Sequence, residues 1–188
     1  MADIPLVTLQ RLVAALDSVP ALYAIIGGVA VSIQSVPRFT EDVDAVIWFG
    51  EDNWDVLLEK LTASGFTSRS GDPIDFARKN RIFLLTDHDG VHVDLSIGAL
   101  PFEETVVRNA DRIEIAPGTF ASIATVESLI VMKAVAWRPK DILDIREIVS
   151  INPEFDRKYV VDTFSEYAEL LEVPERVGQL EAIFDEKS

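Results

Sequence analysis

The chain has 188 residues, of which 48% are hydrophobic, and it carries a formal net charge of −15. This length and apolar content suit one ordinary domain, or a core with a small helical appendage, and exclude a disordered acidic tail. The 17 basic residues against 32 acidic ones argue against indiscriminate nucleic-acid binding, and the absence of cysteine excludes disulfides and thiol chemistry.

The N-terminal sequence and the hydropathy pattern give no sign of export or membrane insertion. Residues 1–5 (MADIP) lack the basic region and apolar core of a signal peptide. No apolar run approaches the roughly 20 residues of a membrane-spanning helix. We therefore expect a cytoplasmic protein without a membrane partner.

The first third of the chain predicts helices alternating with short strands. Apolar residues recur at helical spacing in 6–18 and 52–64, and the Gly27-Gly28 turn indicates a further helix between two strand-like runs. Pro37 and Gly65 mark the ends of the second and third helices. The expected elements, in chain order, are helix 6–18, strand 22–26, helix 29–36, strand 42–49, helix 52–64 and a short strand at 66–69.

After a loop at 71–73, two strands are expected at 81–86 and 91–97, joined by a turn at Asp89-Gly90. An edge strand is expected at 112–116. From Thr125, a candidate N-cap, the pattern becomes helical, with helices at 126–137, 140–150, 156–171 and 174–186.

Strands mixed with helices, followed by helices only, predict an α/β (α+β) fold. We expect a small mixed sheet flanked by helices in residues 1–120, and a helical C-terminal region in residues 121–188 packed on this core.

Three aspartates stand out in this pattern. Asp42 and Asp44 open an expected strand, and side chains two residues apart in a strand share a face. Asp94 lies between Val93 and Leu95 in a later strand. Carboxylates in apolar surroundings are costly unless a cation compensates them, and oxygen-only clusters suit Mg²⁺ or Mn²⁺. The alternatives are a solvated strand edge for the pair and a hydrogen-bonded structural role for Asp94.

A glycine pair precedes these aspartates. Gly27-Gly28 lies between an expected strand and a helix start, where backbone N–H groups can face a phosphate. The alternative is ordinary turn chemistry. Arg38 and Thr40 precede the first aspartate, and either contact phosphate or support the loop.

Together these residues resemble the nucleotidyltransferase superfamily that includes DNA polymerase beta. The resemblance rests on Gly27-Gly28, Arg38-x-Thr40-x-Asp42-x-Asp44 and the later Asp94, and it extends over residues 20–150. The segment LIVMKAVAWRPKDILDI at 129–145 is similar to the second motif of AbiEii-type toxins and their short relatives.

The resemblance implies a metal-dependent enzyme that moves a nucleoside monophosphate from an NTP to an acceptor hydroxyl. Asp42, Asp44 and Asp94 would hold two Mg²⁺ ions, and Asp94 would help deprotonate the acceptor. Gly27, Gly28, Arg38, Thr40, Lys133, Lys140 and Asp141 would contact the nucleotide or orient the acceptor.

Three residues of the second motif also have structural interpretations. Lys133, in an apolar stretch, either reaches the triphosphate or extends its ammonium to solvent. Asp141 would stabilise the start of the next helix, and Lys140 would pair with Asp144 one turn on. The apolar residues Leu129, Met132 and Ala136 are expected in the core.

The acceptor stays open between a tRNA end, a protein hydroxyl and a small cationic molecule such as an aminoglycoside. The toxin resemblance also implies a cognate antitoxin as partner. A second functional class is a catalytically silent nucleotide- or partner-binding module of the same fold; the presence of all three aspartates argues against it.

Overall fold

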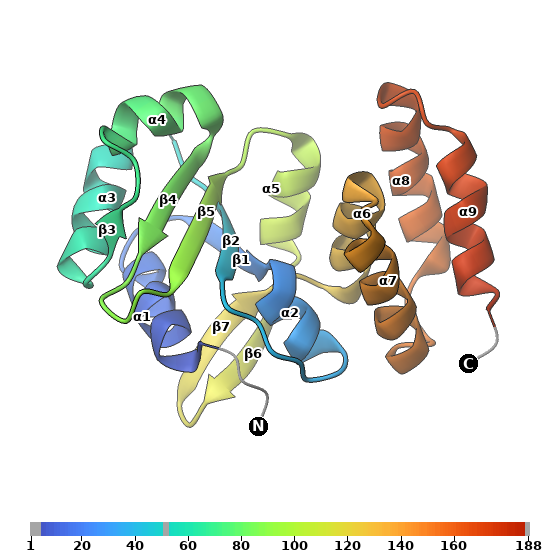
Figure 1. The fold of residues 1–188 in the computed structure, drawn as a ribbon, viewed down its shortest axis with the longest axis horizontal. Coiled ribbons are helices and arrows are strands. Elements are labelled where there is room, and N and C mark those ends of the chain that lie inside the picture. The colour runs from blue at the N-terminus through green and yellow to red at the C-terminus, as the bar shows by residue number, and fades with distance from the viewer. Residues whose placement is uncertain (1–4, 51–52, 187–188) are drawn as a thin grey trace. The chain divides into compact units, whose positions relative to one another are not determined.

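The computed structural model describes residues 5–50 and 53–186, and these form two compact units (Figure 1). The sheet unit comprises the described residues within Met1–Ser32 and Pro37–Ala124, and the helical unit comprises those within Ile33–Val36 and Thr125–Ser188. Residues 1–4, which belong to the segment tested for an export signal, lie outside the described residues, as does residue 52, the expected start of the third helix.

The sheet unit contains a seven-stranded mixed sheet with the order β3-β4-β5-β2-β1-β7-β6. β2 pairs antiparallel with β1 and parallel with β5. It therefore lies between β1 and β5, which are far apart from each other in the sequence. The strands are β1 (Leu22–Ile26), β2 (Val43–Trp48), β3 (Thr67–Ser68), β4 (Ile82–Thr86), β5 (His92–Ile97), β6 (Asp111–Ala116) and β7 (Thr119–Ile123).

Burial alternates along β4 and β5, so this half of the sheet has one core face and one partly open face. Phe83 on β4 and Val93 and Leu95 on β5 are fully or almost fully buried. Trp54 packs edge-on against Phe83 with ring centroids 6.2 Å apart. Asp94 lies on the opposite, half-exposed face, because it alternates with these core residues. Asp94, a metal-ligand candidate from the sequence, therefore lies on the partly open face.

Helices cover the sheet through apolar side chains. α1 packs beside α3 and touches β7, whereas α5 packs on β1 and β2. Ile33 and Gln34, the last residues of α2, belong to the helical unit. The helices of this part are α1 (Leu6–Asp17), α2 (Gly27–Gln34), α3 (Trp54–Ala63), α4 (Pro73–Asn80) and α5 (Pro101–Arg108).

The helical unit is built from α6 (Val126–Ala136), α7 (Pro139–Ile151), α8 (Arg157–Leu170) and α9 (Glu175–Phe184). Thr125 caps α6 as expected, since its hydroxyl accepts the Ser128 N–H at 3.2 Å. Trp137 adopts a left-handed conformation (φ 50°) that ends α6 and lets the chain turn into α7. Its ring stacks on Phe164 of α8 with centroids 6.2 Å apart.

The mixed fold and the four C-terminal helices are confirmed, but three elements were missed. α4 follows Asp72, whose carboxylate accepts the Asp75 N–H at 2.9 Å, and α5 begins at Pro101. The sequence interpretation placed a loop at 71–73 and no element at 101–108, although proline is favoured in the first turn of a helix. The third missed element is β7, which pairs antiparallel with β6 across a turn at Gly118.

Two smaller expectations also change. Asp42 lies immediately before β2 and not inside it. In α6, Leu129 is buried as expected, but Met132 is half-buried and Ala136 is exposed. None of the helices in the described ranges combines the length and apolar character needed to span a bilayer.

Candidate active site

The glycine pair lies where β1 passes directly into α2. Gly27 has a positive φ of 64°, and a Cβ at this position would lie 1.9 Å from Oδ2 of Asp44. A Cβ on Gly28 would lie 2.6 Å from the Thr40 hydroxyl oxygen. Both glycines are therefore required by close approach of side chains from the next loop and strand. The first-turn N–H groups of α2, which have no partner inside the helix, lie at the same place.

The loop before β2 is held against α2 by Ser32. The Arg38 backbone N–H donates to the Ser32 hydroxyl at 3.0 Å, and this hydroxyl donates to the Arg38 carbonyl at 3.2 Å. One guanidinium nitrogen of Arg38 lies 4.0 Å from the Cβ position of Gly28. The structure thus brings Gly27, Gly28, Arg38 and Thr40 together around the start of α2. Ser32, 5% exposed, was missed because a lone serine in a helix carries no distinctive signal.

Asp44 and Asp94 lie directly opposite each other on neighbouring strands. They are register partners in the parallel β2–β5 pair, so their side chains share the half-exposed face of the sheet. Asp44 is also paired with Ile26 on β1, next to Gly27. Two carboxylates in adjacent register positions repel each other unless a cation lies near them.

Asp42 precedes β2 and is exposed, and it lines a cleft with a volume of about 490 Å³. The cleft is formed by the loop before β2 and by the turn between β4 and β5. Its lining includes three carboxylates, contributed by Glu41, Asp42 and Asp89, and the aromatic ring of Phe39. Among the described residues, no lysine or arginine lines it.

Arg69 is a residue of this face that the sequence interpretation missed. It follows the two-residue strand β3, and its guanidinium forms an ion pair with the Asp94 carboxylate. Its Nε also donates to the Leu85 carbonyl at 3.0 Å. No local pattern around residue 69 indicated this contact, because it depends on the position of β3 at the edge of the sheet.

The donor set fits a hard divalent cation. Asp42, Asp44 and Asp94 offer only oxygen ligands, which Mg²⁺ and Mn²⁺ prefer. The missing Cβ of Gly27 leaves room for the Asp44 carboxylate against the start of α2. The Arg69 guanidinium on Asp94 shows in addition that this carboxylate is placed to bind a positive charge.

The second motif forms a buried ionic cluster inside the helical unit. The Lys133 ammonium on α6 lies 2.5 Å from Oδ2 of Asp144 and 3.4 Å from Oδ1 of Asp141, both on α7. Lys133 is only 8% exposed, so the expectation of an ammonium extended to solvent is wrong. The expected Lys140–Asp144 pair is also wrong, because Asp144 pairs with Lys133 and Lys140 is exposed.

Asp141 has the helix-start role that the sequence suggested. Its carboxylate accepts the Arg138 backbone N–H at 3.1 Å and the Arg138 Nε at 2.6 Å. Burial opposes ionisation of this carboxyl, but the hydrogen bonds from Arg138 and the charge of Lys133 outweigh it and lower the pKa of Asp141. Lys133 and Asp141 thus lie together in one unit, whereas Lys140 does not join their cluster.

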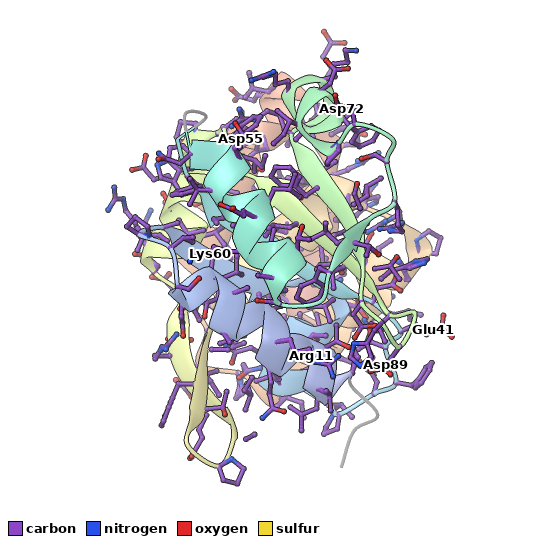
Figure 2. All side chains as sticks on the ribbon, turned by 90° about the vertical axis from the view of Figure 1, so that its left-hand side faces the viewer. Arg11, Glu41, Asp55, Lys60, Asp72 and Asp89 are labelled. Atoms are coloured by element: carbon purple, nitrogen blue, oxygen red, sulfur yellow. The ribbon has the colours of Figure 1, made fainter. Side chains whose placement is uncertain are left out.

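Among the described residues, Asp87, His88 and Asp89 in the turn between β4 and β5 bring three potential metal-ligand atoms within 4.8 Å of one another, whereas Asp42, Asp44 and Asp94 do not form such a group. The Asp87 carboxylate already accepts the Thr8 hydroxyl at 2.6 Å and the backbone N–H groups of Asp89 and Val91. Arg11 on α1 lies 3.5 Å from both Asp87 and Asp89; Figure 2 shows Arg11 beside Asp89. Through these contacts the three residues hold the β4–β5 turn against α1. His92, two residues before Asp94, is the first residue of β5 after this turn and is exposed.

The overall arrangement is similar to that of several solved nucleotidyltransferase structures. A nucleotidyltransferase-like protein from Paracoccidioides brasiliensis is 22% identical, with a TM-score of 0.57 over 97% of this chain and 92% of that chain. The antibiotic-resistance factor ANT(2'')-Ia is 16% identical, with a TM-score of 0.61 over 95% and 99% of the two chains. JHP933 from Helicobacter pylori is 12% identical, with a TM-score of 0.52 over 98% and 94%. At these identities the likeness shows the fold.

No curated protein was found to match the chain. The family described as "Nucleotidyl transferase AbiEii toxin, Type IV TA system" matches residues 9–187, which include the glycine pair, the three aspartates and the buried Lys133 cluster. The chain therefore belongs to the AbiEii nucleotidyl transferase family.

Proposed function

We propose that this protein is a metal-dependent nucleotidyltransferase that transfers a nucleoside monophosphate from an NTP to an acceptor hydroxyl and releases pyrophosphate. The observation that carries the proposal is the register pairing of Asp44 with Asp94 beside the Gly27-Gly28 turn. It places two carboxylates on one face of the sheet, next to N–H groups suited to phosphate.

The roles of the residues follow from their positions. Gly27 and Gly28 let the triphosphate approach the start of α2, and Arg38 and Thr40 lie where they would bind its oxygens. Asp42, Asp44 and Asp94 would hold Mg²⁺ or Mn²⁺, which when bound neutralises the charge that develops on the phosphates. Asp94 accepts the proton of the attacking hydroxyl. Such a transfer depends on positioning and charge neutralisation, so it requires no nucleophilic side chain.

Lys133 and Asp141 are proposed as an internal support of the helical unit, and a direct contact of either residue with nucleotide stays a prediction. Lys140 is exposed, and we propose that it orients the acceptor. The family relationship supports a toxin whose activity a cognate antitoxin restrains. For this function we propose a tRNA end as the acceptor.

The cleft beside Asp42 favours a second class of acceptor. The described part of its lining has three carboxylates and no lysine or arginine, so it would attract a positively charged small molecule and repel the phosphates of RNA. A hydroxyl-bearing polyamine bound there would lie next to the proposed metal ligands. Aminoglycosides have this chemistry.

Transfer of radiolabel tests the proposal. The protein is incubated with each α-³²P-labelled NTP and MgCl₂, together with either total tRNA or tobramycin. Label in tRNA supports the toxin function, and label in tobramycin supports a cationic acceptor. Asp44→Asn should abolish either product, and EDTA should do the same. If no NTP is consumed and no label appears in tRNA, in tobramycin or in protein, the protein is a catalytically silent member of its family.

A further inference from the structure

Arg69 is anchored to the sheet by its backbone and along its side chain. Its backbone N–H donates to the Leu84 carbonyl at 2.8 Å, and its Nε donates to the Leu85 carbonyl at 3.0 Å. The end of the guanidinium, through Nη2, binds Oδ1 of Asp94. The side chain is 29% exposed, and that of Asp94 is 37% exposed. Arg69 is therefore held by three hydrogen bonds, two to carbonyl groups of β4 and one to Asp94 on β5.

The guanidinium reaches the face of the sheet that carries the proposed metal ligands. Asp94 is the register partner of Leu84 on one side and of Asp44 on the other, so all three side chains share this face. A guanidinium is a planar cation whose N–H groups match the geometry of a carboxylate. One oxygen of the Asp94 carboxylate is therefore bound by the positively charged Arg69 guanidinium. The Asp44 carboxylate lies on the neighbouring strand β2.

We propose that Arg69 is a built-in counter-cation of the metal site, which neutralises Asp94 in the metal-free protein and competes with the divalent ion for that carboxylate. This inference rests on the proposed function, since it requires Asp94 to be a metal ligand. Without a cation, Asp44 and Asp94 would repel each other across the β2–β5 pair. With Arg69 in place, a divalent ion gains less binding free energy from Asp94, because the ion must displace the guanidinium or share the carboxylate with it.

The pair also has a consequence for the order of binding. A guanidinium released from Asp94 needs another anion, and the triphosphate of the nucleotide provides one on the same face of the sheet. The site is therefore poor at retaining metal without nucleotide.

Titration with Mn²⁺ alone tests this inference without measuring activity. Free Mn²⁺ is followed by electron paramagnetic resonance in the wild-type protein, in Arg69→Gln and in Arg69→Met. Both variants should bind Mn²⁺ about fivefold more tightly, which equals ~1 kcal/mol and is what a partly exposed ion pair contributes. Circular dichroism establishes that each variant is folded.

Arg108→Gln is the matched control. It removes the same charge from an exposed pair with Glu104 on α5, so it lowers the net charge from −15 to −16 just as Arg69→Gln does. Its Mn²⁺ affinity should equal that of the wild type. The inference is overturned if both Arg69 variants bind Mn²⁺ with unchanged or weaker affinity, or if Arg108→Gln tightens binding equally. Absence of saturable Mn²⁺ binding in every protein, wild type included, overturns the proposed metal site itself.

Discussion

The Lys133 ammonium and the Asp144 carboxylate form a buried ion pair between α6 and α7, with 2.5 Å between Nζ and Oδ2. Lys133 is 8% exposed and Asp144 is 1% exposed. Removing one member of such a pair leaves the other charge uncompensated away from water. This relationship changes what a substitution at Lys133 measures, because a loss of nucleotide binding would be mixed with a loss of stability.

We expect Lys133→Met to lower the free energy of unfolding by about 3–5 kcal/mol. Urea denaturation followed by circular dichroism measures this change. The double variant Lys133→Met/Asp144→Leu should recover most of the loss, because no unpaired charge remains at position 144. A loss below about 1 kcal/mol for Lys133→Met would contradict the structural role and favour a lysine kept for its ligand.

Gly27→Ala should destabilise the protein and weaken Mg²⁺–NTP binding. An alanine at φ 64° is strained by about 1–2 kcal/mol, and its Cβ would also collide with the Asp44 carboxylate. Gly118→Ala is the matched control, since Gly118 has a φ of 73° and nothing within 4 Å of its Cβ position. Gly27→Ala should cost at least about 1 kcal/mol more than the control, because the Asp44 side chain must move. Equal costs for both variants, with equal NTP binding by calorimetry, would show that Asp44 does not depend on the small residue.

Asp44→Asn should separate metal binding from folding. The substitution removes one of two facing carboxylates, but Arg69 already compensates the charge of Asp94, so we expect the stability of the metal-free variant to change by less than about 1 kcal/mol. MgCl₂ should raise the melting temperature of the wild type, as any ligand of the folded state does, and should leave that of the variant unchanged. Differential scanning fluorimetry with and without MgCl₂ measures both effects. Asp55→Asn, on the exposed side of α3, controls for the loss of one charge; an equal Mg²⁺ shift in all three proteins would remove Asp44 from the ligand set.

Asp87 should make stability depend on acidic pH. Burial opposes its ionisation, but hydrogen bonds from Thr8, Val91 and Asp89 and the charge of His88 lower the pKa of Asp87 below its ordinary value of 3.8. Its contribution is therefore fully present above pH 3.8 and is lost as the pH falls through the lower pKa of the folded state. At pH 7, Asp87→Asn should cost about 1–3 kcal/mol, and the difference from wild type should shrink at pH 3. Urea unfolding at the two pH values checks this; a constant difference would mean that Asp87 is not ionised.

The parts of the site that follow from local periodicity could be predicted from the sequence. Alternation in β5 places Asp94 opposite the core residues Val93 and Leu95, and the strand after Asp42 is apparent from its β-branched residues. The glycine turn is also a local signal. What the sequence does not contain is the order of strands, and the pairing of Asp44 with Asp94 requires β2 to lie beside β5.

The missed interactions have the same physical origin. Arg69 follows a strand of two residues, and its contact with Asp94 exists only because β3 pairs with β4, which in turn pairs with β5. Lys133 finds its carboxylates because the left-handed Trp137 reverses the chain between two helices. A bulky residue with positive φ is rare, so sequence patterns do not indicate that reversal.

The parallel pairing of β2 with β5 also governs when the site can exist. The hairpin of β4 and β5 joins neighbouring segments and can form rapidly, whereas pairing distant segments in parallel is slow. Asp44 leaves the ribosome well before Asp94, and the two carboxylates face each other only after the later strand has docked. A chain interrupted before residue 94 carries the glycine turn but not the facing carboxylates, so the proposed metal site can form only after β5 has been synthesised.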